Sequence, residues 1–146
     1  MTTEINDINR VILFQIDQTS KIAKQYSQRE LDRRELGITV DQWVLLKIIE
    51  ESAPLSQKEL GTRSKRDPAS ITRTLDLLAK KGLIERAAME NNRRQYNILL
   101  TPAGASFVRA NMGMITGLRE QSVQGFSPEE LQQLHSMLKR IQENMT

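Results

Sequence analysis

Two closely spaced helix starts constrain the fold of this 146-residue chain more than any other feature of its sequence. Ser56 and Glu59 have the spacing of a capping box, in which each side chain bonds to the backbone amide of the other residue, and they predict a short helix. Asp67 followed by Pro68 predicts the start of another helix, and the run Lys80 to Gly82 predicts its end. Two short capped helices joined by a few residues predict a helix-turn-helix.

The hydrophobic period changes from helical to strand-like after this second helix. Tyr96, Ile98 and Leu100 recur at every second position, and residues 83–89 also have the character of a short strand. The run between them, Glu-Asn-Asn-Arg-Arg at 90–94, suits a turn because asparagine tolerates a positive φ. These segments predict a β-hairpin with two arginines at its tip. Such a hairpin is called a wing when it directly follows a helix-turn-helix.

Apolar stripes predict further helices before this region. Residues 5–26 carry apolar side chains at spacings of three and four, which predict one long amphipathic helix, and Gly37 ends the helix that precedes it. Either Thr39 or Asp41 caps a following helix. The sequence Ala53-Pro54 ends that helix, because proline disfavours a helical conformation at the residue before it.

Two more helices are predicted after the hairpin. Thr101-Pro102 repeats the N-cap and proline signal and starts a helix that runs to about residue 124. Ser127, with Glu130 three positions later, starts the last helix. Its apolar residues have the spacing of a coiled-coil seam: Leu131, Leu134, Leu138, Ile141 and Met145. The stripes of the terminal helices have no obvious partner in the winged core, so they pack either together within one chain or against a second copy.

The excess positive charge lies in the central segment. The whole chain has 21 basic and 18 acidic residues, a formal net charge of +3. Residues 58–94 hold ten basic and five acidic side chains, whereas residues 1–57 hold seven and nine, and residues 95–146 hold four and four. A concentrated cationic surface attracts polyanions. An ordinary solvated surface is the alternative interpretation of such a run.

Missing residue types exclude several kinds of chemistry. The chain has no cysteine, which excludes disulfides, thiolate metal ligands and cysteine nucleophiles. His135 is the lone histidine, and we expect it at the surface or at an interface rather than on a metal. No phosphate-binding glycine loop or nucleophile–base set occurs, so we predict no enzyme activity and no cofactor. Neither a membrane span nor a secretory signal is recognisable, and we expect the protein in the cytoplasm.

The order of the predicted elements suits double-stranded DNA, whose major groove admits one α-helix. On the helix that follows Asp67, apolar residues would face the core and small polar or basic residues would face outward. Arg73 suits guanine, and an arginine on the hairpin suits a narrow minor groove. The candidate DNA-binding residues are Ser56, Lys58, Arg63, Lys65, Arg66, Ala69, Ser70, Thr72, Arg73, Arg93 and Arg94.

The sequence resembles the MarR family of bacterial winged helix-turn-helix transcriptional regulators. The wing signature of that family is Asp-x-Arg followed, after five residues, by Leu-Thr-x-x-Gly. Here NNRRQYNILLTPAG carries it as Asn92-x-Arg94-x5-Leu100-Thr101-x-x-Gly104, and SITRTLDLLAKKGLIER is similar to the recognition helix and the strand after it. Asn92 replaces the family's aspartate, so it cannot form that residue's ion pair with the wing arginine. Glu90 is an alternative partner.

This resemblance implies a single MarR-like domain over residues 1–146, mainly α with a small β-hairpin in the α+β class. Residues 39–100 would form the winged DNA-binding lobe, and residues 1–38 and 101–146 the helical dimerisation region. A homodimer would bind a pseudo-palindromic operator, commonly as a repressor that a small aromatic or lipophilic effector releases. The candidate ligand-lining residues are Tyr26, Trp43 and Met112, with plain core packing as the alternative. The other functional alternative is a winged module for protein contact or non-specific nucleic-acid binding.

Overall fold

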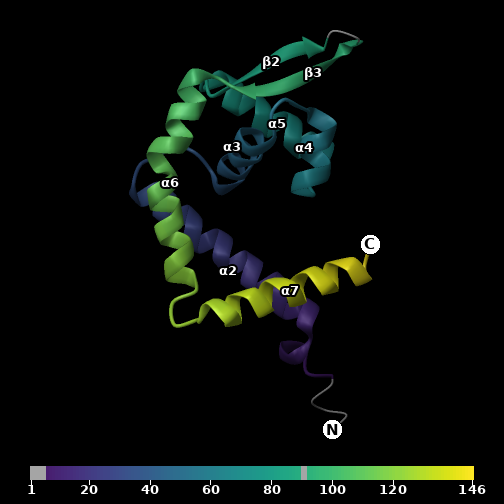
Figure 1. The fold of residues 1–146 in the computed structure, drawn as a ribbon, viewed down its shortest axis with the longest axis vertical. Coiled ribbons are helices and arrows are strands. Elements are labelled where there is room, and N and C mark those ends of the chain that lie inside the picture. The colour runs from purple at the N-terminus through teal and green to yellow at the C-terminus, as the bar shows by residue number, and fades with distance from the viewer. Residues whose placement is uncertain (1–5, 90–91) are drawn as a thin grey trace. The chain divides into compact units, whose positions relative to one another are not determined.

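The computed structural model describes residues 6–89 and 92–146, except for the side chains of residues 92–94. The chain divides into two compact units, Met1–Ala110 and Asn111–Thr146. The elements are η1 (Ile8–Arg10), α2 (Ile12–Arg33), α3 (Val40–Ser52), β1 (Leu55–Ser56), α4 (Gln57–Ser64), α5 (Pro68–Lys80), β2 (Ile84–Met89), β3 (Asn92–Leu100), α6 (Pro102–Ser122) and α7 (Pro128–Asn144) (Figure 1). The predicted class, mainly α with a small sheet, is confirmed. No helix in the described part of the chain has the length and apolarity needed to cross a membrane.

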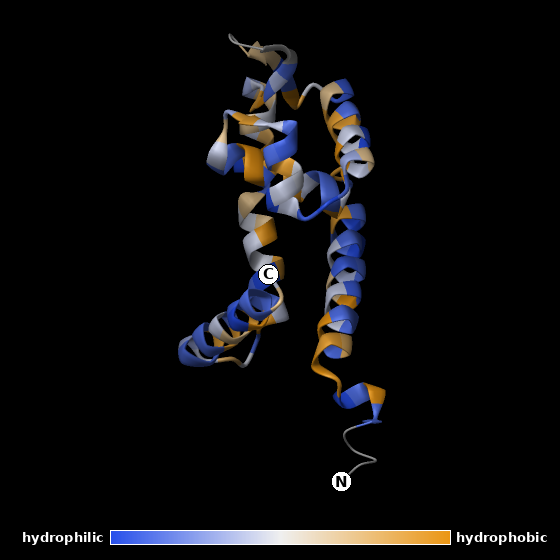
Figure 2. Cartoon of the chain, turned by 90° about the vertical axis from the view of Figure 1, so that its right-hand side faces the viewer, coloured by the Kyte–Doolittle hydropathy of each residue, from blue (hydrophilic) through white to orange (hydrophobic). Residues whose placement is uncertain are grey.

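The N-terminal segment is divided where the sequence predicts one continuous helix. The expected start at Ile5 lies outside the described residues. The carboxylate of Asp7 accepts a hydrogen bond of 3.0 Å from the amide of Asn9 and starts the 3-10 helix η1. Val11 is extended, with φ −75° and ψ 120°, so α2 begins only after it. The prediction of a single long helix is therefore wrong at this end, although hydrophobic residues do recur along α2 (Figure 2).

The other end of α2 lies before Gly37. Glu35 adopts a left-handed conformation with φ 54°. The amide of Leu36 donates to the carbonyl of Leu31 at 3.2 Å, a bond that closes helix C-termini of this kind. Gly37 is also left-handed, with φ 73°, but α2 has already ended at Arg33.

Thr39, rather than Asp41, caps α3. Its hydroxyl accepts a hydrogen bond of 3.1 Å from the amide of Gln42, and the Gln42 side chain accepts one of 3.1 Å from the amide of Thr39. The helix ends at Ser52, directly before Ala53-Pro54, as predicted.

The helices α4 and α5 form the predicted helix-turn-helix, and both predicted N-caps are present. The hydroxyl of Ser56 accepts from the amide of Glu59 at 3.1 Å. The carboxylate of Asp67 accepts from the amide of Ser70 at 3.0 Å. α5 ends at Lys80, and Gly82 follows with φ 74°.

The core of the first unit holds α5 in a fixed rotation. Figure 1 shows α3, α4 and α5 grouped on one side of the β2–β3 hairpin. Their fully buried side chains, with those of the sheet, are Leu45, Leu46, Ile49, Leu55, Leu60, Ile71, Leu75, Leu78 and Ile98. Burying one such side chain is worth about 1.5–3 kcal/mol. The buried side chains therefore fix which face of α5 points into the core, and the opposite face is left at the surface.

The predicted hairpin is part of a three-stranded antiparallel sheet with the order β1-β3-β2. The sequence did not predict β1, whose Leu55 lies opposite Ile98 of β3. β3 already begins at Asn92, so the backbone of Arg93 and Arg94 belongs to a strand rather than to the predicted turn. Residues 90–91 lie outside the described part, and so do the side chains of the two arginines.

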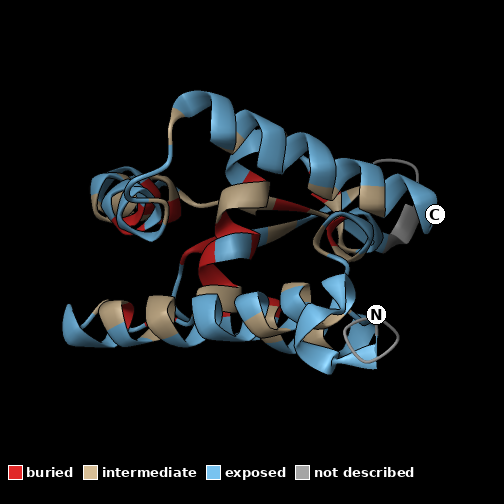
Figure 3. Cartoon of the chain, turned by 90° about the horizontal axis from the view of Figure 1, so that it is seen from below, coloured by how far each residue is buried: buried red, intermediate tan, exposed pale blue. Residues whose placement is uncertain are grey.

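The second unit contains the C-terminal part of α6 and the whole of α7. α6 ends at Ser122, two residues before the predicted end, and Gly125 follows with φ 89°. Ser127 and Glu130 form the predicted capping box at the start of α7. α7 has no buried residue, and Figure 3 shows the helix that leads to the label C in the colours of exposed and half-buried residues. Its seam residues are half-buried (Leu131, Leu138, Ile141) or exposed (Leu134, Met145).

Candidate nucleic-acid interface

The outward face of α5 carries the side chains expected to contact bases. Ile71 and Leu75 are buried, with exposed fractions of 1% and 0%, whereas Ala69, Thr72 and Arg73 are exposed. The helical period places these two sets on opposite faces. A small side chain and a guanidinium are thereby presented together near the N-terminal end of a rigidly packed helix. This is the arrangement that a major groove can accept.

Ser70 is less accessible to DNA than its neighbours Ala69, Thr72 and Arg73 on α5. Its side chain is half-buried, and its hydroxyl donates to the carboxylate of Asp67 at 3.0 Å. The hydrogen bonds from the hydroxyl and the amide of Ser70 lower the pKa of Asp67, and the nearby positive charges of Arg73 and Arg66 add to this effect. Asp67 is consequently a charged N-cap at neutral pH. Because the Ser70 hydroxyl already donates its proton to Asp67, it can only accept a further hydrogen bond.

Gln57 is a surface residue that the sequence analysis missed. It is the first residue of α4, and its side-chain amide donates to the hydroxyl of Thr72 at 2.7 Å. The Thr72 hydroxyl in turn donates to the carbonyl of Pro68 at 3.0 Å. Thr72 and Gln57 thus form one polar unit across the helix-turn-helix. The glutamine could not be singled out from the sequence, because a polar residue beside a capping serine has no distinctive spacing.

The cations predicted around the turn differ in their surroundings. Lys58 and Lys65 are exposed, and Lys65 adopts a left-handed conformation with φ 60° at the end of α4. Arg63 is also exposed and donates to the hydroxyl of Ser52 on α3. Ser56 is half-buried, and its hydroxyl is used in capping α4. An anion at this end of α4 would therefore be bound by the backbone amides of the first turn, at the positive end of the helix dipole, rather than by the Ser56 hydroxyl.

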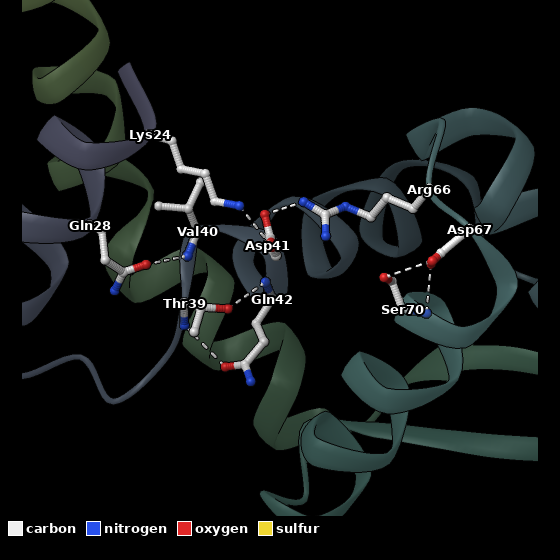
Figure 4. A network of polar contacts seen from close by, with 9 residues as sticks. All are labelled: Lys24, Gln28, Thr39, Val40, Asp41, Gln42, Arg66, Asp67 and Ser70. Carbon is white, nitrogen blue, oxygen red and sulfur yellow. Dashed lines mark hydrogen bonds and ion pairs between the residues drawn. The ribbon is translucent and has the colours of Figure 1, made fainter. Parts of the chain in front are cut away.

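Arg66 forms an intramolecular ion pair with Asp41 of α3 (Figure 4). The second carboxylate oxygen of Asp41 accepts from the ammonium of Lys24 on α2 at 3.1 Å. Partial burial raises the pKa of Asp41, but the hydrogen bonds and positive charges of Arg66 and Lys24 outweigh it, and the pKa is lowered. Unlike the exposed Lys58 of α4 and Lys65 of the turn, Arg66 already has an ion pair.

A groove of about 780 Å³ lies between the two helices and β3. Its walls come from α4 and its N-cap, from the loop and the first residues of α5, and from β3. The lining residues are Ser56, Gln57, Lys58, Glu59, Gly61, Thr62, Arg66, Pro68, Ile71, Gln95 and Tyr96. The groove therefore adjoins the predicted phosphate contacts of α4 and the wing.

The Thr-x-x-Gly end of the wing signature has a structural explanation in this chain. The hydroxyl of Thr101 donates to the carbonyl of Gly82 at 2.6 Å and accepts from the amide of Gly104 at 2.9 Å. A Cβ at Gly104 would overlap the backbone carbonyl group of Leu83. Thr101 and Gly104 thus fasten the start of α6 against the loop between α5 and β2.

The three candidate ligand residues belong to two different units. Trp43 is buried, with 3% exposed, and its ring lies 6.4 Å from that of Phe107 at an interplanar angle of 56°. Within the described residues, its indole N–H is buried and has no hydrogen-bond acceptor. Tyr26 is half-buried in the same unit, whereas Met112 is half-buried in the second unit.

A helix-turn-helix followed by a β-hairpin, with a cationic outward surface, defines a winged helix-turn-helix protein. Residues 38–96 match the sequence model of the MarR family. This segment is therefore a MarR-family domain, and the resemblance inferred from the wing signature is confirmed. Members of this family are transcriptional regulators rather than enzymes, in agreement with the sequence analysis.

Solved structures of family members share the fold over most of the chain. A MarR variant from E. coli in complex with operator DNA is 25% identical, with 97% of each chain covered and a TM-score of 0.81. A MarR/EmrR family transcriptional regulator from Acinetobacter sp. ADP1 is 22% identical, with 95% of this chain and 97% of that chain covered and a TM-score of 0.87. S. aureus MepR in complex with DNA is 23% identical, with 92% and 98% covered and a TM-score of 0.81.

Proposed function

We propose that this chain is a sequence-specific DNA-binding transcriptional regulator that inserts α5 into the major groove. The observation that carries this proposal is the exposed set Ala69, Thr72 and Arg73, above a face of α5 that is completely buried. Arginine can form a bidentate contact with guanine, and an alanine methyl can contact that of thymine. The E. coli relative, similar over nearly the whole chain, was solved in complex with operator DNA, which supports DNA binding by this chain.

Phosphate contacts would come from the flanks of α5. Lys58, Arg63 and Lys65 are exposed around the turn, and the amides at the start of α4 add a positive helix end. Arg93 and Arg94 follow in β3, and we propose that the wing places one of them in the adjacent minor groove. Among the predicted cations whose side chains the structure describes, Arg66 is the one with an ion pair, which it forms with Asp41.

A homodimer is the proposed binding form. Apolar side chains stay exposed on the N-terminal elements, with exposed fractions of 55% for Ile8, 60% for Ile12 and 64% for Ile22. In the second unit, Leu134 and Met145 of the predicted seam are 41% and 61% exposed. We propose that a second copy of the chain covers these apolar side chains. A dimer with two-fold symmetry would bind a pseudo-palindrome with half-site centres about 10 bp apart.

We further propose repression that a small aromatic or lipophilic effector relieves, as the family resemblance implies. The buried indole N–H of Trp43 supports a nearby binding event, because an unpaired buried donor costs about 1–3 kcal/mol and a bound acceptor would offset that cost. Trp43 is the only tryptophan, so its fluorescence reports on compounds that bind near it. Compounds that quench it should also release the protein from DNA.

Selection from randomised duplexes tests the proposed sequence specificity against the alternative of non-specific binding. Affinity for the selected site is then compared with affinity for a scrambled site over a series of salt concentrations. A specific regulator binds its own site about 10³–10⁷ times more tightly. Equal affinities for the two duplexes would favour the non-specific module, and no binding to either would favour a protein-contact module.

Replacing Arg73 provides the sharpest single-residue test. Arg73→Ala should weaken binding to the selected site by about 1–3 kcal/mol and relax the base preference at one position in each half-site. Arg119→Ala removes the same charge from an exposed position on α6 and serves as the control. Unchanged affinity and preference in the Arg73 variant would disprove the assignment of α5 as the recognition helix.

A further inference from the structure

Arg66 lies between the C-cap of α4, Lys65, and the N-cap of α5, Asp67. Its amide donates to the carbonyl of Gly61 at 3.3 Å, directly after the left-handed Lys65. The next residue, Asp67, is the N-cap of α5. The backbone at Arg66 therefore joins the end of one helix of the motif to the start of the other.

The side chain of Arg66 points back to α3 instead of outward. Its ion pair with Asp41 leaves the two side chains only 26% and 25% exposed. Figure 4 shows the guanidinium and the ammonium of Lys24 approaching the carboxylate from different elements. Both oxygens of Asp41 are thus occupied, one by α2 and the other by the turn.

A paired, partly buried guanidinium differs energetically from an exposed one. Removing Asp41 leaves a partly desolvated guanidinium without its ion pair, whereas removing Arg66 leaves the carboxylate of Asp41 with Lys24 alone. A DNA phosphate that approached Arg66 would have to compete with the carboxylate of Asp41 for the same positive charge. The neighbouring exposed cations have no such competitor in the described contacts: Lys58 and Lys65.

We infer that Asp41 is a positioning residue for the recognition helix, which holds Arg66 as an anchor of the turn and withholds it from the DNA phosphates. This inference depends on the DNA-binding function proposed above. It predicts that Arg66 contributes to the orientation of α5, and hence to base preference, but not to the number of counterions that binding releases.

The dependence of affinity on salt concentration separates an anchor from a phosphate contact. Each phosphate contact contributes about 0.9 to the slope of log affinity against log salt. On a random-sequence duplex, Arg66→Gln should leave the slope of the wild-type protein unchanged. Asp41→Asn should steepen the slope by about one, because it frees Arg66, and the double variant should return it to the wild-type value. Two results would overturn the inference. One is a slope in Arg66→Gln that is shallower than that of the wild type by about one, and the other is a slope in Asp41→Asn equal to that of the wild type.

Base preference supplies a second readout that loss of a phosphate contact would not change. In selection from randomised duplexes, Arg66→Gln should broaden the preference at the positions facing α5, and Arg66→Lys should restore it in part. An unaltered preference in Arg66→Gln would contradict the positioning role. Circular dichroism identifies any variant that is unfolded under the binding conditions.

The ion pair can also be tested without DNA. In a double-mutant cycle of urea unfolding, the Asp41→Asn and Arg66→Gln changes should be non-additive. Additive effects would disprove the pair itself. If the pair is present but the wild-type chain binds no duplex, the proposed DNA-binding function fails while the structural part of the inference stands.

Discussion

Gly104 is a residue whose lack of a side chain decides how two elements meet. The start of α6 approaches the loop after α5 so closely that a Cβ at this position would lie 2.9 Å from the carbonyl carbon of Leu83 and overlap its oxygen. Thr101 holds the same joint by bonding to Gly82 and to the amide of Gly104. The Thr-x-x-Gly part of the wing signature is therefore needed for packing.

Gly104→Ala should destabilise the protein by about 1–3 kcal/mol, the usual cost of forcing extra atoms into a packed site. Urea unfolding followed by circular dichroism measures the change. The matched control is Gly113→Ala, which adds the same methyl group to the same helix where nothing lies within 4 Å. That variant should gain about 0.5–1 kcal/mol, because alanine favours helix over glycine. Equal effects of the two changes would contradict the close approach at Gly104.

The pH dependence of stability should reveal the contacts of Asp41. Hydrogen bonds from Arg66 and Lys24 lower the pKa of Asp41 below its ordinary value of 3.8 in spite of partial burial. A carboxyl group with a lowered folded-state pKa stabilises the fold above its unfolded pKa, and this stabilisation is lost as the pH falls through the lower value. The advantage of the wild type over Asp41→Asn should therefore be constant between pH 5 and pH 7 and shrink below pH 3.8. Urea unfolding at several pH values measures it, and a pH-independent difference would contradict the assignment.

At the scale of elements, caps set most of the helix starts in this fold. Ser56, Thr39 and Ser127 each form a complete capping box, and Asp67 caps α5 without one. These caps act through neighbours three residues away, so they were visible in the sequence. The division of η1 from α2 was not, because Asp7 is a local cap hidden inside a continuous apolar stripe.

The capping box of α7 can be tested by removing one hydroxyl. Ser127→Ala should lower stability by about 1 kcal/mol, because the amide of Glu130 loses its acceptor at the helix start. Ser136→Ala, an exposed position within α7, should be neutral or slightly stabilising because alanine favours helix. Thermal unfolding of the two variants gives the comparison. A Ser127 variant as stable as the Ser136 variant would show that the cap contributes little.

At the scale of the whole molecule, the proposed dimer depends on apolar surface that the single chain leaves exposed. Truncation before Ser127 removes α7 with its seam residues, including Leu134 and Met145. Because less apolar surface would then be buried between two copies, the truncated chain should dissociate at concentrations where the full chain remains dimeric. Sedimentation velocity over a concentration series measures this. A truncated chain that stays dimeric throughout would place the interface elsewhere.

The sequence by itself determined the local structure: the caps, the inward face of α5, the hairpin and the cationic segment. These features depend on residues a few positions apart, where period and spacing are visible. Only the tertiary structure decided which side chains are already paired within the chain. Asp41 and Arg66 are 25 residues apart, and Gln57 and Thr72 are 15 apart. The same holds for β1, two residues long, which pairs with β3 across more than one intervening helix. Partners at such separations are set by the packing of the core, and no periodicity in the chain encodes them.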